Sequence, residues 1–192
     1  ARIGGIGQHP SERVAALEHY RLIKSHESPS GRYIRSVRRT QQLTNASSFR
    51  ALRNSPSWVK TFEKVPGATI EGSGAPPGAE VRATASMQIP SNGRTFSYTQ
   101  YATADEAGNF EMTVPYSTTG YEDYVPDNGY TNVSVRATGE YQFQATDGGE
   151  VYLKRAAVDE AKVVGEDKSP VNVELEQEQL QQISQQTAQT AG

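Results

Sequence analysis

Residues 81–89 alternate strictly between apolar and polar side chains. The apolar residues take every second position: Val81, Ala83, Ala85, Met87 and Ile89. A period of two residues puts the apolar set on one face of a strand, so the pattern predicts a half-buried β-strand. The segment that follows, Ile89-Pro90-Ser91-Asn92-Gly93, ends in Asn-Gly, which is typical of a tight hairpin turn.

Similar short runs recur along the chain between clusters of Gly, Pro, Asn and Asp. The predicted strands cover residues 59–65, 68–72, 80–89, 95–103, 109–115, 131–138, 141–145, 151–154, 162–164 and 171–175. Turn signals such as Pro66-Gly67 and Asp147-Gly148-Gly149 separate them. Short strands at this spacing predict a mainly β fold, an antiparallel β-sandwich of about seven strands.

Four zones organise the chain. Residues 1–27 are predicted to form a small α/β segment, which consists of a Gly-rich turn, a short helix that begins near Pro10 and a strand. Residues 28–57 are basic and polar and predict a linker, and residues 58–175 are the β module. Residues 176–192 are rich in Gln and too polar to build a core, so they predict a disordered, low-complexity tail.

Composition narrows the classes of protein. The 192 residues include no Cys, which excludes disulfides and thiolate zinc sites, and the mean hydropathy is −0.67. The three histidines, His9, His19 and His26, lack the spacing of a zinc helix motif. No run of 18 apolar residues exists in the sequence. The start A-R-I-G-G-I-G has no Met and no signal-peptide pattern, and it favours a fragment of a longer protein.

Charge is distributed unevenly along the chain. Residues 1–64 hold 12 Lys or Arg and 4 Asp or Glu, whereas residues 65–192 hold 7 and 18. A basic first part is consistent with a solvated face or with contact to anionic lipid headgroups. Binding of nucleic acid is disfavoured, because the basic cluster at 35–39 lacks the interleaved aromatic residues of a stacking platform.

One loop of the β module, residues 116–130, is unusual. It holds four tyrosines, which we predict to form a docking or contact loop, because tyrosine is common at protein interfaces. The alternative is a loop that packs on its own tyrosines. The candidate contact residues are Tyr116, Tyr121, Tyr124 and Tyr130. The acidic residues Glu122, Asp123 and Asp127 suggest Ca²⁺ as a further alternative, although they lack the spacing of a calcium loop.

The sequence offers few other candidate residues for modification, catalysis or metal binding. Asn45 and Asn132 each begin an N-x-Ser sequon and are candidate N-glycosylation sites. A catalytic nucleophile usually needs a histidine base within reach, and the β module contains no histidine. We therefore predict no catalytic residue and no metal site in this segment.

The string Thr103-Ala104-Asp105-Glu106-Ala107-Gly108-Asn109-Phe110 resembles the T-x-D-x-x-G-x-F strand–turn–strand of carboxypeptidase-regulatory-like, prealbumin-like sandwiches. Three longer strings, at residues 10–23, 57–75 and 114–137, resemble the C-terminal region of haloarchaeal oligosaccharyltransferase catalytic subunits of the AglB type. The first of these resemblances concerns fold, and the second concerns both fold and function.

The second resemblance implies a parent membrane enzyme of archaea. Such a glycosyltransferase moves an oligosaccharide from a dolichol-phosphate-type lipid carrier to the Asn of N-x-S/T sequons outside the cell, and it needs Mn²⁺ or Mg²⁺. The W-W-D-Y-G motif and the acidic metal ligands of such enzymes have no counterpart in this sequence. Its single Trp is Trp58, in the string S-W-V-K.

On this resemblance, residues 1–27 end the central domain of the parent and residues 58–175 form a peripheral accessory domain facing the exterior. The implied partners are the catalytic and transmembrane parts of the same chain and, through them, the lipid-linked oligosaccharide and the acceptor protein. The alternative function is an independent secreted or cell-surface β-sandwich that binds or adheres through the loop at 116–130.

Overall fold

The computed structural model describes residues 12–25, 60–90 and 93–178. Its longest hairpin joins β4 (Glu80–Ile89) to β5 (Arg94–Thr103), which pair antiparallel from Glu80–Thr103 to Ile89–Arg94. The apolar set of β4 is at most 3% exposed, so the predicted alternation is confirmed. The amide of Gly93 donates to the carbonyl of Ile89 over 2.9 Å at the end of this hairpin.

The larger sheet has the strand order β11-β9-β8-β4-β5, and β7 also pairs with β4. Its other strands are β7 (Arg136–Ala137), β8 (Tyr141–Asp147), β9 (Glu150–Ala156) and β11 (Glu176–Gln177). β8 and β9 form a hairpin closed by Gly148 and Gly149, both at positive φ, as a two-residue type I′ turn requires. All pairings in this sheet are antiparallel.

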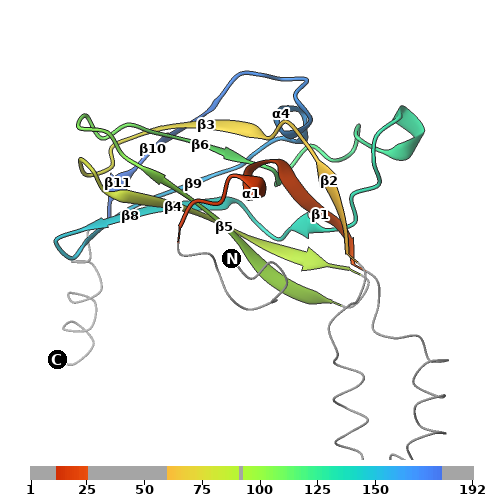
Figure 1. The fold of residues 1–192 in the computed structure, drawn as a ribbon, viewed down its shortest axis with the longest axis horizontal. Coiled ribbons are helices and arrows are strands. Elements are labelled where there is room, and N and C mark those ends of the chain that lie inside the picture. The colour runs from red at the N-terminus through yellow and green to blue at the C-terminus, as the bar shows by residue number, and fades with distance from the viewer. Residues whose placement is uncertain (1–11, 26–59, 91–92, 179–192) are drawn as a thin grey trace, which may run out of the picture.

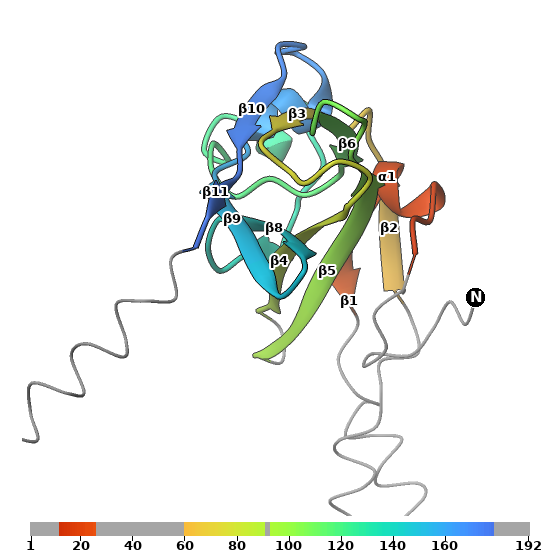
Figure 2. The ribbon, with the colours of Figure 1, turned by 90° about the vertical axis from the view of Figure 1, so that its left-hand side faces the viewer.

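A smaller sheet has the order β10-β3-β6. It consists of β3 (Ala68–Ser73), β6 (Phe110–Val114) and β10 (Val171–Glu174), and β10 pairs parallel with β3. Figure 2 shows this sheet lying over one side of the larger one. The hydrophobic core lies between them, since one cluster contains Ile70 and Met112 of the small sheet together with Val81 and Phe143 of the large sheet.

The connection from β5 to β6 contains the predicted T-x-D-x-x-G-x-F turn. The carboxylate of Asp105 accepts hydrogen bonds from the amides of Ala107 (2.9 Å) and Asn109 (2.7 Å), and these bonds lower its pKa. Gly108 has a φ of 81°, and a Cβ there would overlap the carbonyl oxygen of Ala75. The turn therefore requires both its aspartate and its glycine.

The N-terminal described segment packs against this module (Figure 1). It contains the short helix α1 (Ala16–His19) and β1 (Tyr20–Ser25), which pairs antiparallel with β2 (Lys60–Lys64). Leu22 of β1 belongs to the common core, and the hydroxyl of Tyr98 on β5 donates to the carbonyl of Leu17 over 2.8 Å. Residues 12–25 and the β module thus share one hydrophobic core.

The strand predicted at 162–164 is wrong, because these residues lie in the helix α4 (Glu160–Val164). Asp159 caps the helix by accepting a hydrogen bond from the amide of Ala161, and Gly165 ends it at a φ of 85°. The strand predicted at 131–138 is confirmed only at β7. Just before it, both the amide and the hydroxyl of Ser134 donate to the carbonyl of Ile23. This stretch is therefore bound to β1 near its end and does not form a strand of its own.

The predicted mainly β, antiparallel fold class with a small α/β region is confirmed. The classification as a prealbumin-like sandwich, the division into four zones and the disordered Gln-rich tail stay predictions. All of the predicted linker and most of the predicted tail lie outside the described residues. The first two residues of the predicted tail form β11, which pairs with β9. No helix among the described residues is long and apolar enough to cross a membrane.

Candidate functional site

The tyrosine loop, residues 116–130, leads from β6 to the 3₁₀ helix η1 (Pro126–Asn128) and on toward β7. Its first tyrosine, Tyr116, is 5% exposed, and its hydroxyl accepts a hydrogen bond from the amide of Leu22 over 2.7 Å. The ring centroid of Tyr116 lies 5.1 Å from that of Tyr98, and burial raises the pKa of Tyr116 to about 12. Tyr116 is therefore a core residue that anchors the loop, and its side chain does not form part of the exposed contact surface that the sequence predicts.

Tyr121, the second tyrosine of the loop, is half-buried. Its hydroxyl donates a hydrogen bond to the carbonyl of Ser117, four residues earlier. The guanidinium of Arg136 lies 4.3 Å from the centroid of its ring, which is a cation–π contact. Burial raises the pKa of Tyr121. These contacts hold the middle of the loop against the residues that lead into β7.

Tyr124 and Tyr130 form a pair at the tip of the loop. Their ring centroids lie 4.8 Å apart with the ring planes at 69°, an edge-to-face arrangement. Both hydroxyls donate to the carboxylate of Glu166, which follows α4, and the bond from Tyr124 measures 3.1 Å. Desolvation and this carboxylate raise the pKa of Tyr124 to about 12. Of the four predicted contact residues, this pair is the one that the structure brings together near the surface.

The acidic residues of the loop do not converge. Glu122, Asp123 and Asp127 are exposed, and no group of three or more His, Cys, Asp or Glu among the described residues could hold a metal ion. The calcium alternative therefore has no geometric support in the described part of the chain. His19 lies at the end of α1 with its Nδ1 atom 2.8 Å from the carbonyl oxygen of Pro66, whereas His9 and His26 lie outside the described residues.

Of the two sequons, the structure describes only the one that begins at Asn132. Asn132 is exposed, but Ser134 of the same sequon is bound to the carbonyl of Ile23 through its hydroxyl at 2.7 Å and its amide at 3.0 Å. The hydroxyl of this sequon is thus occupied in the folded chain. Asn45 lies outside the described residues, and glycosylation of both sites stays a prediction.

Sequence reasoning missed a buried ionic cluster. Arg21 of β1 is 2% exposed and contacts Glu160 of α4, 1% exposed, with Nη1 and Oε1 2.8 Å apart. Its Nε atom also lies 2.8 Å from a carboxylate oxygen of Glu63 on β2, and the hydroxyl of Ser117 donates to Glu160. A substrate cannot reach side chains this buried, so the cluster is structural. The signal in the sequence was Arg21 directly before the apolar pair Leu22 and Ile23 of a predicted strand.

The model of one protein family, described as the archaeal glycosylation protein B long peripheral domain, matches residues 67–168. The dolichyl-monophosphooligosaccharide–protein glycotransferase AglB of Haloferax volcanii is 49% identical over 186 residues, which covers 92% of this chain. The chain spans only 18% of the length of that relative.

Solved structures agree at the level of fold. The crystal structure of the Archaeoglobus fulgidus oligosaccharyltransferase in complex with Zn and sulfate matches with a TM-score of 0.56 and 19% identity, over 85% of this chain and 23% of that chain. The Archaeoglobus fulgidus AglB in complex with an inhibitory peptide and a dolichol-phosphate matches with a TM-score of 0.55, again at 19% identity, over 85% of this chain and 21% of the other. Identity at this level speaks for a common fold alone.

Proposed function

Because the chain belongs to the archaeal glycosylation protein B long peripheral domain family, we propose that it is the C-terminal accessory region of an archaeal oligosaccharyltransferase. The parent enzyme would transfer an oligosaccharide from a dolichol-phosphate-type lipid carrier to the Asn of N-x-S/T sequons in protein N-glycosylation. The observation that carries the proposal is the 49% identity to the Haloferax volcanii glycotransferase over 92% of this chain. The parent would lie in the cell membrane with this region facing the exterior.

An accessory role fits the chemistry of the described residues. His19, the single described histidine, is bound to the carbonyl of Pro66, and the buried charges of Arg21 and Glu160 neutralise each other. If the parent needs Mn²⁺ or Mg²⁺, the described residues do not fit that ion, because they provide no cluster of three ligands. The ion would then be held by other parts of the parent, as would the catalytic residues.

The tip of the tyrosine loop is the part of this region that we propose to contact the catalytic part of the same chain. Tyr124 and Tyr130 are held in one arrangement by Glu166, so little side-chain entropy is lost when a partner covers them. Tyrosine is enriched in the residues that dominate binding energy at interfaces. The buried Tyr116 anchors the base of the loop and leaves its tip to make the contact.

A transfer assay tests the proposed activity. The parent protein and the chain of residues 1–192 are each incubated with a dolichol-phosphate-linked oligosaccharide and a peptide that contains an N-x-T sequon. We expect glycopeptide from the parent and none from the chain alone. A parent that forms no glycopeptide would overturn the proposed activity, and turnover by the chain alone would overturn the accessory role.

Limited proteolysis of the parent tests the contact. The variant Tyr124→Ala/Tyr130→Ala should release this region faster than the unmodified parent, whereas the control Tyr20→Ala, an exposed tyrosine of β1, should not. Equal release from both variants would contradict the assignment of the tyrosine loop. A gene in which this chain follows its own start codon and signal peptide would favour the alternative, an independent secreted or cell-surface binding module.

A further inference from the structure

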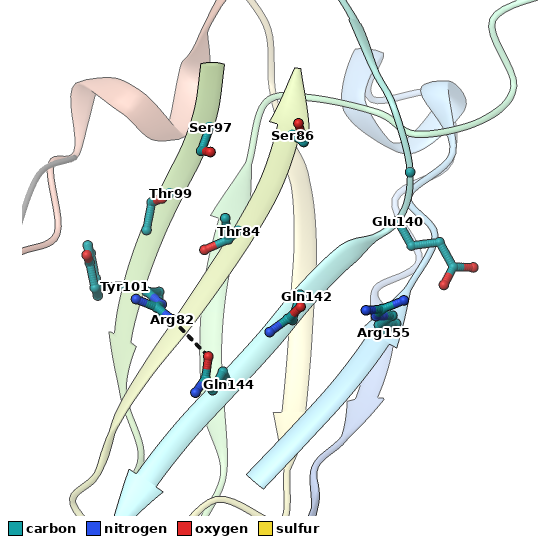
Figure 3. A pocket seen from close by; sticks show the side chains of 11 residues that line it. Arg82, Thr84, Ser86, Ser97, Thr99, Tyr101, Glu140, Gln142, Gln144 and Arg155 are labelled. Atoms are coloured by element: carbon teal, nitrogen blue, oxygen red, sulfur yellow. Dashed lines mark hydrogen bonds between the residues drawn. The ribbon is translucent and has the colours of Figure 1, made fainter. Parts of the chain in front are cut away.

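The outer face of the larger sheet is hollowed, and the hollow is polar (Figure 3). This polar hollow has a volume of about 550 Å³ and is built from β5, β4, β8 and β9, which are neighbours in the sheet. Its main lining side chains are Arg82, Thr84, Tyr101, Gln142, Gln144 and Arg155. These residues alternate with the core positions of the same strands, so the sheet itself fixes their spacing.

Much of the hydrogen-bonding capacity of the polar hollow is free. Nη2 of Arg82 donates to Oε1 of Gln144 over 2.8 Å, which leaves the remaining guanidinium donors and the amide nitrogen of Gln144 available. Among the described residues, Gln142 and Arg155 have no side-chain hydrogen bond or ion pair. Figure 3 shows Gln142 between the two arginines: it lies opposite Arg155 of β9, whereas Arg82 of β4 lies opposite Gln144.

The charge of the polar hollow is opposite to that of the module around it. Residues 65–192 have an excess of acids, and two of their lysines, Lys154 and Lys162, are paired with carboxylates. In the polar hollow, Arg82 contacts a neutral amide, and Glu140 is the one acidic residue in the lining. The hollow is therefore a cationic spot on an otherwise acidic half of the chain.

We propose that the polar hollow binds an acidic oligosaccharide, a sugar chain that carries carboxylates. Guanidinium groups bind carboxylates through paired charge-assisted hydrogen bonds. The amides of Gln142 and Gln144 and the hydroxyl of Thr84 are donors and acceptors that match sugar hydroxyls. The volume suits a small ligand, whereas the polar lining disfavours an apolar one. This binding requires no transfer reaction, so it stands apart from the function proposed above.

An NMR titration of the ¹⁵N-labelled chain tests the proposal with three probes. Trigalacturonic acid should shift the amide and side-chain signals of β4, β8 and β9. Maltotriose, a neutral trisaccharide, and citrate, a carboxylate without a sugar ring, should each bind at least about tenfold more weakly, because each lacks one of the two matched groups. Equal binding of either control, or no binding of trigalacturonic acid, would overturn the proposal.

Two charge-matched variants locate the site. Arg155→Gln should weaken the binding of trigalacturonic acid about tenfold, the effect expected for one charge-assisted contact. Lys168→Gln removes an equal charge from an exposed position outside the lining and should leave the affinity unchanged. Both positions are exposed, so unchanged melting temperatures are expected and would show that folding is not the cause. An equal loss in the two variants would indicate attraction by net charge and would refute the site.

Discussion

The guanidinium of Arg21 lies 2.8 Å from the carboxylate of Glu160, although 139 residues separate them in the sequence. Both side chains are buried, at 2% and 1% exposure. The pair joins β1 to α4, and Glu63 extends it to β2. Because Ser117 also donates to Glu160, one cluster connects the described N-terminal segment to the start of the tyrosine loop.

Removal of one member of this cluster should be costly. Arg21→Leu leaves the charge of Glu160 buried without its cation, and such a loss typically destabilises a protein by about 3–5 kcal/mol. Lys154→Ala, which removes an ion pair with Glu176 whose two side chains are 41% and 70% exposed, should cost far less. Urea unfolding at neutral pH measures both changes. Equal and small losses would show that the buried pair has no special role.

The turn between β5 and β6 gives a second test. Gly108→Ala should destabilise the chain by clearly more than about 1 kcal/mol, because the alanine must adopt a positive φ and also displace the carbonyl of Ala75. Gly129→Ala is the matched control. It has a φ of 88° but open space around the new Cβ, so its cost should stay at about 1 kcal/mol. Thermal unfolding compares the two, and similar melting temperatures would contradict the clash.

Asp105 should contribute to the pH dependence of stability. Hydrogen bonds from Asn109 and from the amides of the turn lower the pKa of its carboxyl in the folded chain. A group with a lowered folded pKa stabilises above its unfolded value, near about 3.9, and loses that contribution as the pH falls toward the folded value. Asp105→Asn should therefore be less stable than the natural chain at pH 7, and the difference should shrink below about pH 4. Urea midpoints from pH 7 to pH 3 measure it. A difference that stays constant would refute the ionic contribution.

The tyrosine loop should respond differently at its middle and its tip. Tyr121→Ala loses the contact with Arg136 and the hydrogen bond to Ser117, so we expect a loss of about 2 kcal/mol. Tyr124→Ala removes an exposed hydrogen bond and one ring contact at the tip and should cost clearly less than Tyr121→Ala. Denaturant unfolding distinguishes the two. A large loss in Tyr124→Ala would mean that the tip supports the fold and is not free to contact a partner.

Local patterns in the sequence were sufficient to predict most of the strands and one turn. The alternation of β4 reports its two faces directly, because side chains of a strand point alternately to opposite sides. Asp105 and Gly108 likewise act within a few residues of one another, so the resemblance of residues 103–110 to a known strand–turn–strand motif was enough to predict this turn. The prediction failed at 162–164 because two adjacent valines outweighed the capping residues Asp159 and Gly165, which fix a helix.

Other features depend on which segments meet in space. In the sequence alone, nothing connects the two charged residues Arg21 and Glu160. Only the packing of β1 against α4 buries them together. The same holds for Tyr116, which the fold turns into the core while Tyr124 and Tyr130 stay at the surface. The sequence by itself determines what depends on neighbours along the chain, such as strand period and turn chemistry. The tertiary structure decides burial, charge pairing and the polar hollow, because these depend on contacts between residues far apart in sequence.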